Sequence, residues 1–184
     1  YDYGDLPAVY GTTLQSNPDG PSHTIATSPV LYLGATAPDA ELNGTASLLA
    51  NGDGSDEDGV TVLGNWANGA NGGTVQVRIT GSGWLSGWID FNGDGDFTDS
   101  GEMIVSQAVS TGTANYTFNV PAGTFGNGAR ALYARFRLFD SQPLFPSLAY
   151  AGTAALGEVE DYAFSTALLI DKDTSTPWVL PGGQ

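Results

Sequence analysis

Turn-forming residues recur so often along the chain that a long regular helix has little room to form. The 184 residues include 26 Gly and 10 Pro, and glycine and proline favour turns. Between the turns, residues 74–80 alternate apolar and polar side chains, which places Val75, Val77 and Ile79 on one face of a strand. Chains with short strands and frequent turns are usually all-β.

Segments with a strand-like pattern follow one another after Val60. They are residues 74–80, 84–91, 103–109, 115–120, 130–138 and 159–164. In the second segment the alternation sets Leu85, Ile89 and Phe91 opposite Trp84, Trp88 and Asp90. Short strands separated by Gly-rich turns predict a two-sheet β-sandwich that is jelly-roll-like.

Residues 1–59 are dense in turn residues and hold only short apolar runs. This segment is too irregular for a sheet and too aromatic for a disordered tail, so we expect long loops that a ligand such as calcium orders. We predict one ligand-binding β-sandwich domain over residues 1–165 and a tail or linker over residues 166–184. Because the first residue is Tyr1 rather than Met, we expect a domain excised from a longer protein.

The chain is strongly acidic, with 20 Asp and Glu against five Lys and Arg and a formal net charge of −15. Such a surface repels nucleic-acid phosphates and anionic membranes, so we expect neither nucleic-acid binding nor membrane insertion. No apolar run approaches the roughly 20 residues of a membrane-spanning helix. The sequence has no cysteine, which excludes thiolate catalysis, zinc–thiolate sites and disulfides.

The most specific local motif is Asp-Phe-Asn-Gly-Asp-Gly-Asp at residues 90–96, followed by Glu102. Oxygen ligands at alternate positions, with a glycine at the sharp turn, are typical of a calcium loop. Asp90, Asn92 and Asp94 match positions one, three and five of the EF-hand pattern, whereas Glu102 stands one residue beyond the expected bidentate acid. Because the flanks are strand-like, the motif predicts an EF-like calcium loop on a β-hairpin; a solvated polar turn is the alternative.

A second acidic cluster lies just before the first strand candidate. Its acids are Asp53, Asp56, Glu57 and Asp58. Bare carboxylates at this density repel one another and a bound cation removes the repulsion; a solvated charge run is the alternative. Asp39 and Glu41 could add ligands from the same loop-rich region. So could Asp2 and Asp5, although terminal acids are more often solvated.

The third acidic cluster is Gly-Glu-Val-Glu-Asp-Tyr at residues 157–162. On a strand, Glu158 and Glu160 share a face while Asp161 points to the opposite one. Acids in a central strand need partners, and the arginines of the preceding strand candidate are available if the two strands are adjacent: Arg130, Arg135 and Arg137. A structural salt-bridge network and a calcium ligand at Asp161 or Glu158 are both open.

Catalytic motifs are weak. His23 is the only histidine, so a His-rich metal site is excluded. A Ser-His-Asp triad would have to use His23 without a Gly-x-Ser-x-Gly elbow. A two-carboxylate glycosidase is the catalytic alternative that the acids allow. Trp84, Trp88 and Tyr133 could stack on sugars, although aromatics at strand spacing are more often core. We therefore expect a protein that is not an enzyme.

Several motifs occur in an order that resembles the GEVED domain of secreted and surface-anchored bacterial proteins. They are Asp2-Tyr3-Gly4-Asp5, His23-Thr24-Ile25, Leu33-Gly34, Asp39-Ala40-Glu41, Asp56-Glu57-Asp58-Gly59-Val60, residues 87–97, Gly101-Glu102, Val120-Pro121-Ala122 and residues 157–162. The similarity runs from Asp2 to about Phe164. Within that family, the chain is most similar to the calcium-dependent peptide-binding domain of long bacterial RTX adhesins.

The resemblance implies a non-catalytic, extracellular module on a bacterial cell surface, with several Ca²⁺ ions and neighbouring adhesin domains. It implies capture of a peptide or protein C-terminus on a host or partner cell, and hence a role in cell adhesion and biofilms. The implied calcium ligands are Asp90, Asn92, Asp94, Asp96 and Glu102 and, less directly, Asp39, Glu41, Asp53, Asp56 and Asp58. The alternatives are a calcium-dependent, lectin-like carbohydrate-binding module, an accessory domain of a secreted hydrolase and a structural spacer.

Overall fold

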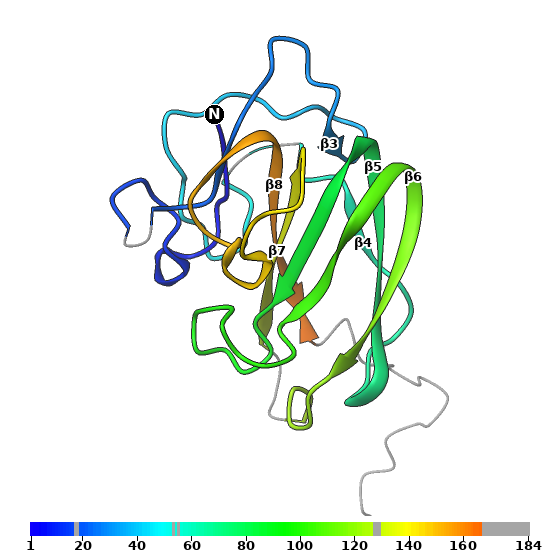
Figure 1. The fold of residues 1–184 in the computed structure, drawn as a ribbon. Coiled ribbons are helices and arrows are strands. Elements are labelled where there is room, and N and C mark those ends of the chain that lie inside the picture. Colours follow the sequence, from blue (N-terminus) through cyan, green and yellow to red (C-terminus); the bar gives the residue numbers. More distant parts are fainter. Residues whose placement is uncertain (17–18, 53, 55, 127–129, 167–184) are drawn as a thin grey trace, which may run out of the picture.

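The computed structural model describes residues 1–16, 19–52, 54, 56–126 and 130–166 (Figure 1). Their strands are β1 (Asp2–Tyr3), β2 (Ser22–Thr24), β3 (Tyr32–Leu33), β4 (Val60–Val62), β5 (Gly69–Ile89), β6 (Met103–Val120), β7 (Ala131–Phe139) and β8 (Thr153–Ser165). Two 3₁₀ helices, η1 (Ala8–Tyr10) and η2 (Pro146–Leu148), lie between strands. The fold is all-β, as the sequence predicts. In the part of the chain described, no helix is long and apolar enough to cross a membrane.

The strands form one curled mixed sheet in the order β1-β2-β8-β7-β5-β3, with β4 and β6 also paired to β5. A long antiparallel hairpin of β5 and β6 dominates it (Figure 1). On the other edge of β5, the first half pairs with β3 and β4 and the second half with β7. β8 is antiparallel to β7 and parallel to β2. One continuous sheet thereby supplies both walls of the core.

The strand candidates are present, but several are joined into longer strands than predicted. Residues 74–80 and 84–91 contribute to β5, and residues 103–109 and 115–120 contribute to β6. Gly81 does not end β5, because a register shift between Ile79 and Ser82 absorbs it, with Gly81 at a φ of 93°. Residues 1–59 also differ from the prediction, since β1, β2 and β3 join the sheet as strands of two or three residues.

Side-chain alternation along β5 supplies two hydrophobic clusters. Val75, Val77, Leu85 and Ile89 belong to the main core, together with the apolar face of β7. Trp88 points the other way and packs with a second cluster, formed with Leu6, Tyr10 and Phe97. The opposition of Leu85 and Ile89 to Trp88 is confirmed. The N-terminal segment therefore covers the second face of the sheet.

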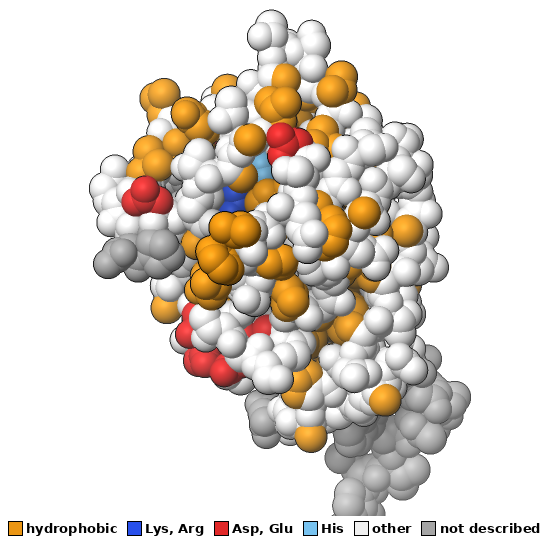
Figure 2. Space-filling view, viewed as in Figure 1, with side chains coloured by type: hydrophobic (Ala, Val, Ile, Leu, Met, Phe, Trp, Pro, Cys, Tyr) orange, Lys and Arg blue, Asp and Glu red, His pale blue; other side chains and the backbone are white. Residues whose placement is uncertain are grey.

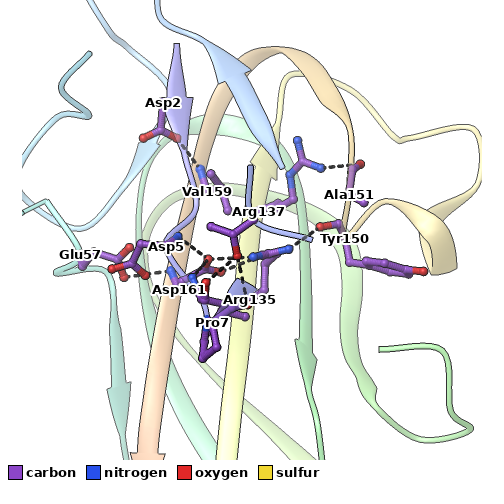
Figure 3. Close-up of polar contacts among 12 residues, drawn as sticks. Asp2, Asp5, Pro7, Glu57, Arg135, Arg137, Tyr150, Ala151, Val159 and Asp161 are labelled. Atoms are coloured by element: carbon purple, nitrogen blue, oxygen red, sulfur yellow. Dashed lines mark hydrogen bonds and ion pairs between the residues drawn. The ribbon is translucent and has the colours of Figure 1, made fainter. Parts of the chain in front are cut away.

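Between β7 and the N-terminal segment lies a buried polar layer centred on Arg137. Its guanidinium donates to His23 Nε2 at 3.0 Å and to four carbonyl oxygens at 2.8–3.0 Å, those of Ser22, Ala149, Ala151 and Gly152. Because Nε2 accepts this bond, His23 is neutral, and its burial lowers its pKa well below the usual range. Arg137 thus ties β2 and the loop before β8 to β7, and Figure 3 shows its contact with Ala151.

Replacing this guanidinium should destabilise the protein strongly. In Arg137→Met, the carbonyl groups and His23 Nε2 lose their buried donor, and we expect a loss of about 3 kcal/mol in the free energy of unfolding. Urea unfolding followed by Trp fluorescence measures it. The matched control is Arg78→Met on an exposed position of β5, expected to change stability by less than about 0.5 kcal/mol. Similar losses in the two variants would contradict this role.

Candidate functional site

The EF-like motif lies in the loop that joins β5 to β6, residues 90–102, at one end of the long hairpin. The backbone N–H of Ile89 donates to the carbonyl of Glu102 at 2.9 Å and closes the base of the loop. Gly93 and Gly95 have φ values of 80° and 95°, which side chains other than glycine rarely adopt. These glycines let the loop fold back over its first residue.

Asp90 is buried at the root of this loop, with 1% of its surface exposed. Its Oδ1 accepts from the N–H of Gly93 at 2.5 Å, and its Oδ2 accepts from the N–H of Gly95 at 3.0 Å. The Tyr10 hydroxyl, from η1, donates to Oδ2 at 2.6 Å. The loop therefore wraps around the carboxylate, as it does around the first acid of a calcium loop.

Glu102 folds back from the other end of the loop and is also buried. Its Oε1 accepts from the N–H of Phe91 at 3.1 Å and its Oε2 from the N–H of Asp99 at 3.3 Å. Burial, with the nearby carboxylates of Asp90 and Asp99, raises the pKa of Glu102 to about 7. A cation in the loop would favour its charged form.

The outer rim of the loop includes one acid that the sequence analysis missed. Asn92 Nδ2 donates to Asp94 Oδ2 at 2.9 Å and to Asp99 Oδ2 at 2.6 Å. Asp99 lies outside the alternate spacing of the motif, so only closure of the loop brings it to Asn92. The Asp96 carboxylate instead accepts from the N–H and hydroxyl of Thr98 at 2.8 and 2.7 Å.

A groove of about 670 Å³ opens beside this loop. Its lining combines Asn92, Asp99 and Glu102 with residues 121–124 and Arg130. The Arg130 guanidinium donates to the carbonyl of Phe91 and, at 3.5 Å, to that of Thr124. One groove is therefore lined by the guanidinium of Arg130, the carboxylates of Asp99 and Glu102, and the amide of Asn92.

A second set of acids surrounds the early part of β8 (Figure 3). β2 pairs with β8 only at residues 153–156, so the edge of β8 beyond them has no strand neighbour on this side. Two acids take its backbone donors instead: Asp2 Oδ2 accepts from the N–H of Val159 at 2.7 Å, and Glu57 Oε2 from that of Asp161 at 2.8 Å. Along this edge of β8, carboxylate side chains thus accept the hydrogen bonds that a neighbouring strand would otherwise accept.

Glu158 and Glu160 project from β8 toward β3 and the loop before β4, and each is 1% exposed. Glu158 Oε2 accepts from the N–H of Leu33. Glu160 Oε1 accepts from the N–H groups of residues 58–59 at 3.1 and 2.9 Å, and its Oε2 accepts from the Tyr162 hydroxyl at 3.0 Å. Both oxygens of Glu160 are therefore engaged.

Of the acids in residues 39–58 that the sequence predicts as calcium ligands, only some are buried beside the acids around β8. Asp56 is buried, and its Oδ2 accepts from the N–H of Asp39 at 3.0 Å. Glu41 Oε2 accepts from a backbone N–H of β1 at 3.1 Å. Asp39 and Asp58 are exposed, and Asp58 Oδ1 accepts from the N–H of residue 35 at 2.8 Å. Asp53 lies outside the described residues.

Asp161 faces the arginine layer on the opposite face of β8. Its Oδ1 accepts from Arg135 Nε at 2.7 Å, and its Oδ2 accepts from Arg135 Nη2 at 2.8 Å and from the N–H groups of Asp5 and Leu6 at 2.7 and 3.0 Å. The salt bridge to β7 is therefore present; a role of Asp161 as a calcium ligand stays a prediction. Arg137 donates to neutral acceptors rather than to an acid.

Buried acids outnumber buried ion pairs. Among the described residues, eight carboxylic side chains are buried, namely Asp2, Asp5, Asp56, Asp90, Glu102, Glu158, Glu160 and Asp161, and one ion pair is formed, Arg135–Asp161. On the face shown in Figure 2, hardly any basic side chain reaches the surface. Burial and neighbouring carboxylates raise the pKa of Glu158 to about 11, and burial raises that of Glu160 to about 8.

The donor set fits a hard cation such as Ca²⁺. Asp2 Oδ1, Glu57 Oε1 and Glu158 Oε1 are buried oxygens without a hydrogen-bond partner, and buried polar atoms otherwise find one. Among the described residues, no three His, Cys, Asp or Glu side chains are gathered tightly enough to hold a metal ion by themselves. Calcium also takes carbonyl, amide and water oxygens, so carboxylate pairs with such donors suffice. When bound, the ion would supply positive charge and coordination positions.

Residues 84–165 match the family model of the GEVED domain. The match begins in the second half of β5, ends with β8, and includes the 90–102 loop and the third acidic cluster. The resemblance to the GEVED domain is therefore confirmed over residues 84–165; the motifs quoted between Asp2 and Val60 lie outside the matched region. No curated protein and no solved structure matches the chain.

The raised pKa values predict how the metal-free protein responds to pH. The folded-state pKa values of Glu102 and Glu160, about 7 and 8, exceed the ordinary value of 4.5, so the folded state holds these protons more tightly than the unfolded state. Their stabilising effect is complete at low pH and is lost as pH rises through 7 and 8. In chelator, the free energy of unfolding should therefore increase from pH 9 to pH 7.

Urea unfolding at fixed ionic strength measures this slope. The window stops at pH 7 because His23, whose pKa is lowered, opposes the trend only below its unfolded value of about 6.5. Glu102→Gln and Glu160→Gln should each flatten part of the slope, whereas Asp140→Asn, at an exposed position, should leave it unchanged. A metal-free protein that loses stability between pH 9 and pH 7 would contradict the expectation.

Proposed function

We propose that this protein is a non-catalytic, calcium-dependent ligand-binding module of an extracellular bacterial adhesin, and that its groove beside the 90–102 loop binds the C-terminal carboxylate of a peptide or protein on a partner cell. The observation that carries the proposal is the placement of Arg130 against the EF-like loop in the wall of that groove. The match of residues 84–165 to the GEVED domain supports the setting, because the motifs resemble the GEVED domains of surface-anchored bacterial proteins.

The electrostatics of the groove support a requirement for calcium. Without a cation, Asp99 and Glu102 would repel a peptide carboxylate from the wall that they share with Arg130. An ion held by Asp90, Asn92 and the loop carboxylates would reverse this local charge and offer a coordination position to the ligand. Arginine presents a planar fork that pairs with a carboxylate through two hydrogen bonds.

The groove also suits a short chain end rather than a long segment. Residues 121–124 also line it, and its volume of about 670 Å³ lies within the ~300–1,000 Å³ of typical ligand pockets. None of the described residues that line the groove is a Trp or Tyr on which a sugar ring could stack. A peptide terminus therefore accounts better for the lining than a sugar does.

A peptide titration tests this function. We expect tetrapeptide libraries with a free C-terminus to contain ligands that bind in calcium and lose binding in chelator. The same sequences made as C-terminal amides should bind at least about tenfold weaker, since they lose the charge that the ion and Arg130 recognise. Isothermal titration calorimetry gives both affinities. Equal binding of acid and amide, or saturable binding of glycans alone, would contradict the proposal.

Two variants separate the parts of the groove. Asp94→Asn should weaken calcium binding by the loop and, through it, peptide binding. Arg130→Gln should weaken peptide binding about tenfold while the loop keeps its calcium affinity, because Arg130 is not a metal ligand. Asp140→Asn removes an equal charge at an exposed position and should change neither affinity.

A further inference from the structure

We infer that the outer edge of β6 pairs with β6 of a second copy of this chain, with residues 113–119 antiparallel to the same residues of the copy. The two sheets would then continue into one another across a two-fold axis near Tyr116, the middle of that segment. None of these residues is among the described ones that line the groove beside the 90–102 loop. The inference therefore does not depend on the proposed peptide binding.

The outer edge of β6 has no strand beside it in the described part of the chain. β6 pairs with β5 from Met103 to Val120 and with no other strand there, and Figure 1 shows it as the outer strand of the hairpin. Its side chains also hydrogen-bond to β5, as Asn115 does with Gln76. An antiparallel strand directs about half of its N–H and C=O groups to each edge, so this edge presents a row of them.

The segment that we assign to the contact is regular. Residues 112–118 pair with residues 73–79 of β5 in unbroken register, and the register shifts lie beyond either end. Tyr116 and Phe118 pack against the main core, and the side chains that alternate with them are exposed, namely Thr113, Asn115, Thr117 and Asn119. A strand with this alternation is a suitable template for another strand.

A groove of about 280 Å³ lies against the same strand. Its lining consists of Ile79, residues 107–114 and Tyr116. Val109 and Tyr116 are hydrophobic side chains that pack on the core and are only partly buried. A neighbouring strand would cover them, so pairing at this edge removes apolar surface from water as well as satisfying backbone groups.

β6 lacks the features that usually protect a free edge. Natural edge strands are short or covered, or they carry charged side chains or proline. None of the 18 residues of β6 is Asp, Glu, Lys, Arg or Pro, although the chain has 20 acids. On β5, Arg78 is the one charged residue. A long edge without charge or proline is a surface to which another strand adds.

The side chains along this edge favour a second copy as the partner. Near a two-fold axis, each residue faces the same residue of the copy or a close neighbour of it. Like charges repel in that position, whereas Thr and Asn both donate and accept hydrogen bonds and so pair with their own kind. The four exposed residues of the segment are all Thr or Asn.

The charge of the chain adds to this argument. Two copies with a formal net charge of −15 each repel one another. Pairing through β6 brings the acid-free β5–β6 hairpins together, so the acids of the two copies stay away from the contact. Among the strands, this edge is therefore the one where close approach costs least.

Analytical ultracentrifugation of the full chain tests the inference. We expect a monomer–dimer equilibrium at constant free calcium, with tighter association in about 0.5 M NaCl than in about 0.02 M, because salt screens the repulsion between the acidic copies. A chain that stays monomeric in high salt up to about 1 mM would overturn the inference.

Charge substitutions at Asn115 locate the interface. Asn115→Lys and Asn115→Asp should each weaken self-association at least about tenfold, because like charges then face each other. When the two variants are mixed, they should associate with each other at least about tenfold more tightly than either does with itself. Thr61→Lys is the matched control: Thr61 and Asn115 flank Gln76 in one row of the sheet, but Thr61 is exposed on β4. This control should dimerise like the wild type.

Wild-type association of Asn115→Lys, or a mixture without a preference for the mixed dimer, would show that the copies meet elsewhere and would overturn the inference. Because Asn115 is exposed, its variants should keep the near-UV circular dichroism of the wild type. They should also keep its affinity for peptides, so a failure of this inference and a failure of the proposed peptide binding are separate results.

Discussion

The structure depends on how the carboxylates buried around β8 lose their charge or have it balanced. Taking a carboxylate out of water is costly unless it is paired, hydrogen-bonded or protonated. Backbone N–H groups from β3, β8 and the loop before β4 satisfy part of this demand at Asp2, Glu158 and Glu160. These bonds position the acids but add no net positive charge. The N-terminal arm (residues 2–10) and the loop before β4 are thus held to the sheet by carboxylates. These carboxylates repel one another unless a proton or a bound cation removes their charge.

Side-chain alternation along β8 places acids without a positively charged partner on one face and an acid with such a partner on the other. Asp161 pairs in register with Arg135 of β7, and the two side chains meet at 2.7 Å in a fully buried ion pair. Glu158 and Glu160 stand opposite Leu138 and Phe136 instead, so their side chains meet apolar neighbours across the strand pair. The same short segment therefore contributes a structural salt bridge on one face and a candidate cation site on the other. A single-residue change of register would exchange these roles.

The local residue pattern predicts much of the sheet. Contacts between distant parts of the chain, in contrast, determine where the acidic side chains lie. Alternation in residues 74–80 correctly placed Val75 and Val77 in the core, and the spacing of the 90–102 loop is visible because its candidate ligands are close in sequence. Asp99 cannot be predicted from this spacing, because only the folded loop brings it to Asn92. Asp2 is brought to Val159 of β8 across 157 residues, and no local pattern encodes that contact. The predicted strands at residues 74–80 and 84–91 both belong to β5, because a bulge between Ile79 and Ser82 lets the strand continue through Gly81.

The N-terminal arm connects the two acidic regions physically. Asp2 lies at the edge of β8, and eight residues later the Tyr10 hydroxyl donates to Asp90 Oδ2 at the root of the 90–102 loop. The Tyr10 ring packs against Phe97 of the same loop, with ring centroids 5.2 Å apart. Between these points, Asp161 accepts the N–H of Leu6. An arm fixed at Asp2 therefore restricts the position of Tyr10, and with it the carboxylate around which the loop folds. Ordering of the N-terminal arm therefore favours ordering of the 90–102 loop, and the reverse also holds. Each segment, once fixed, reduces the conformational entropy that the other loses when it becomes ordered.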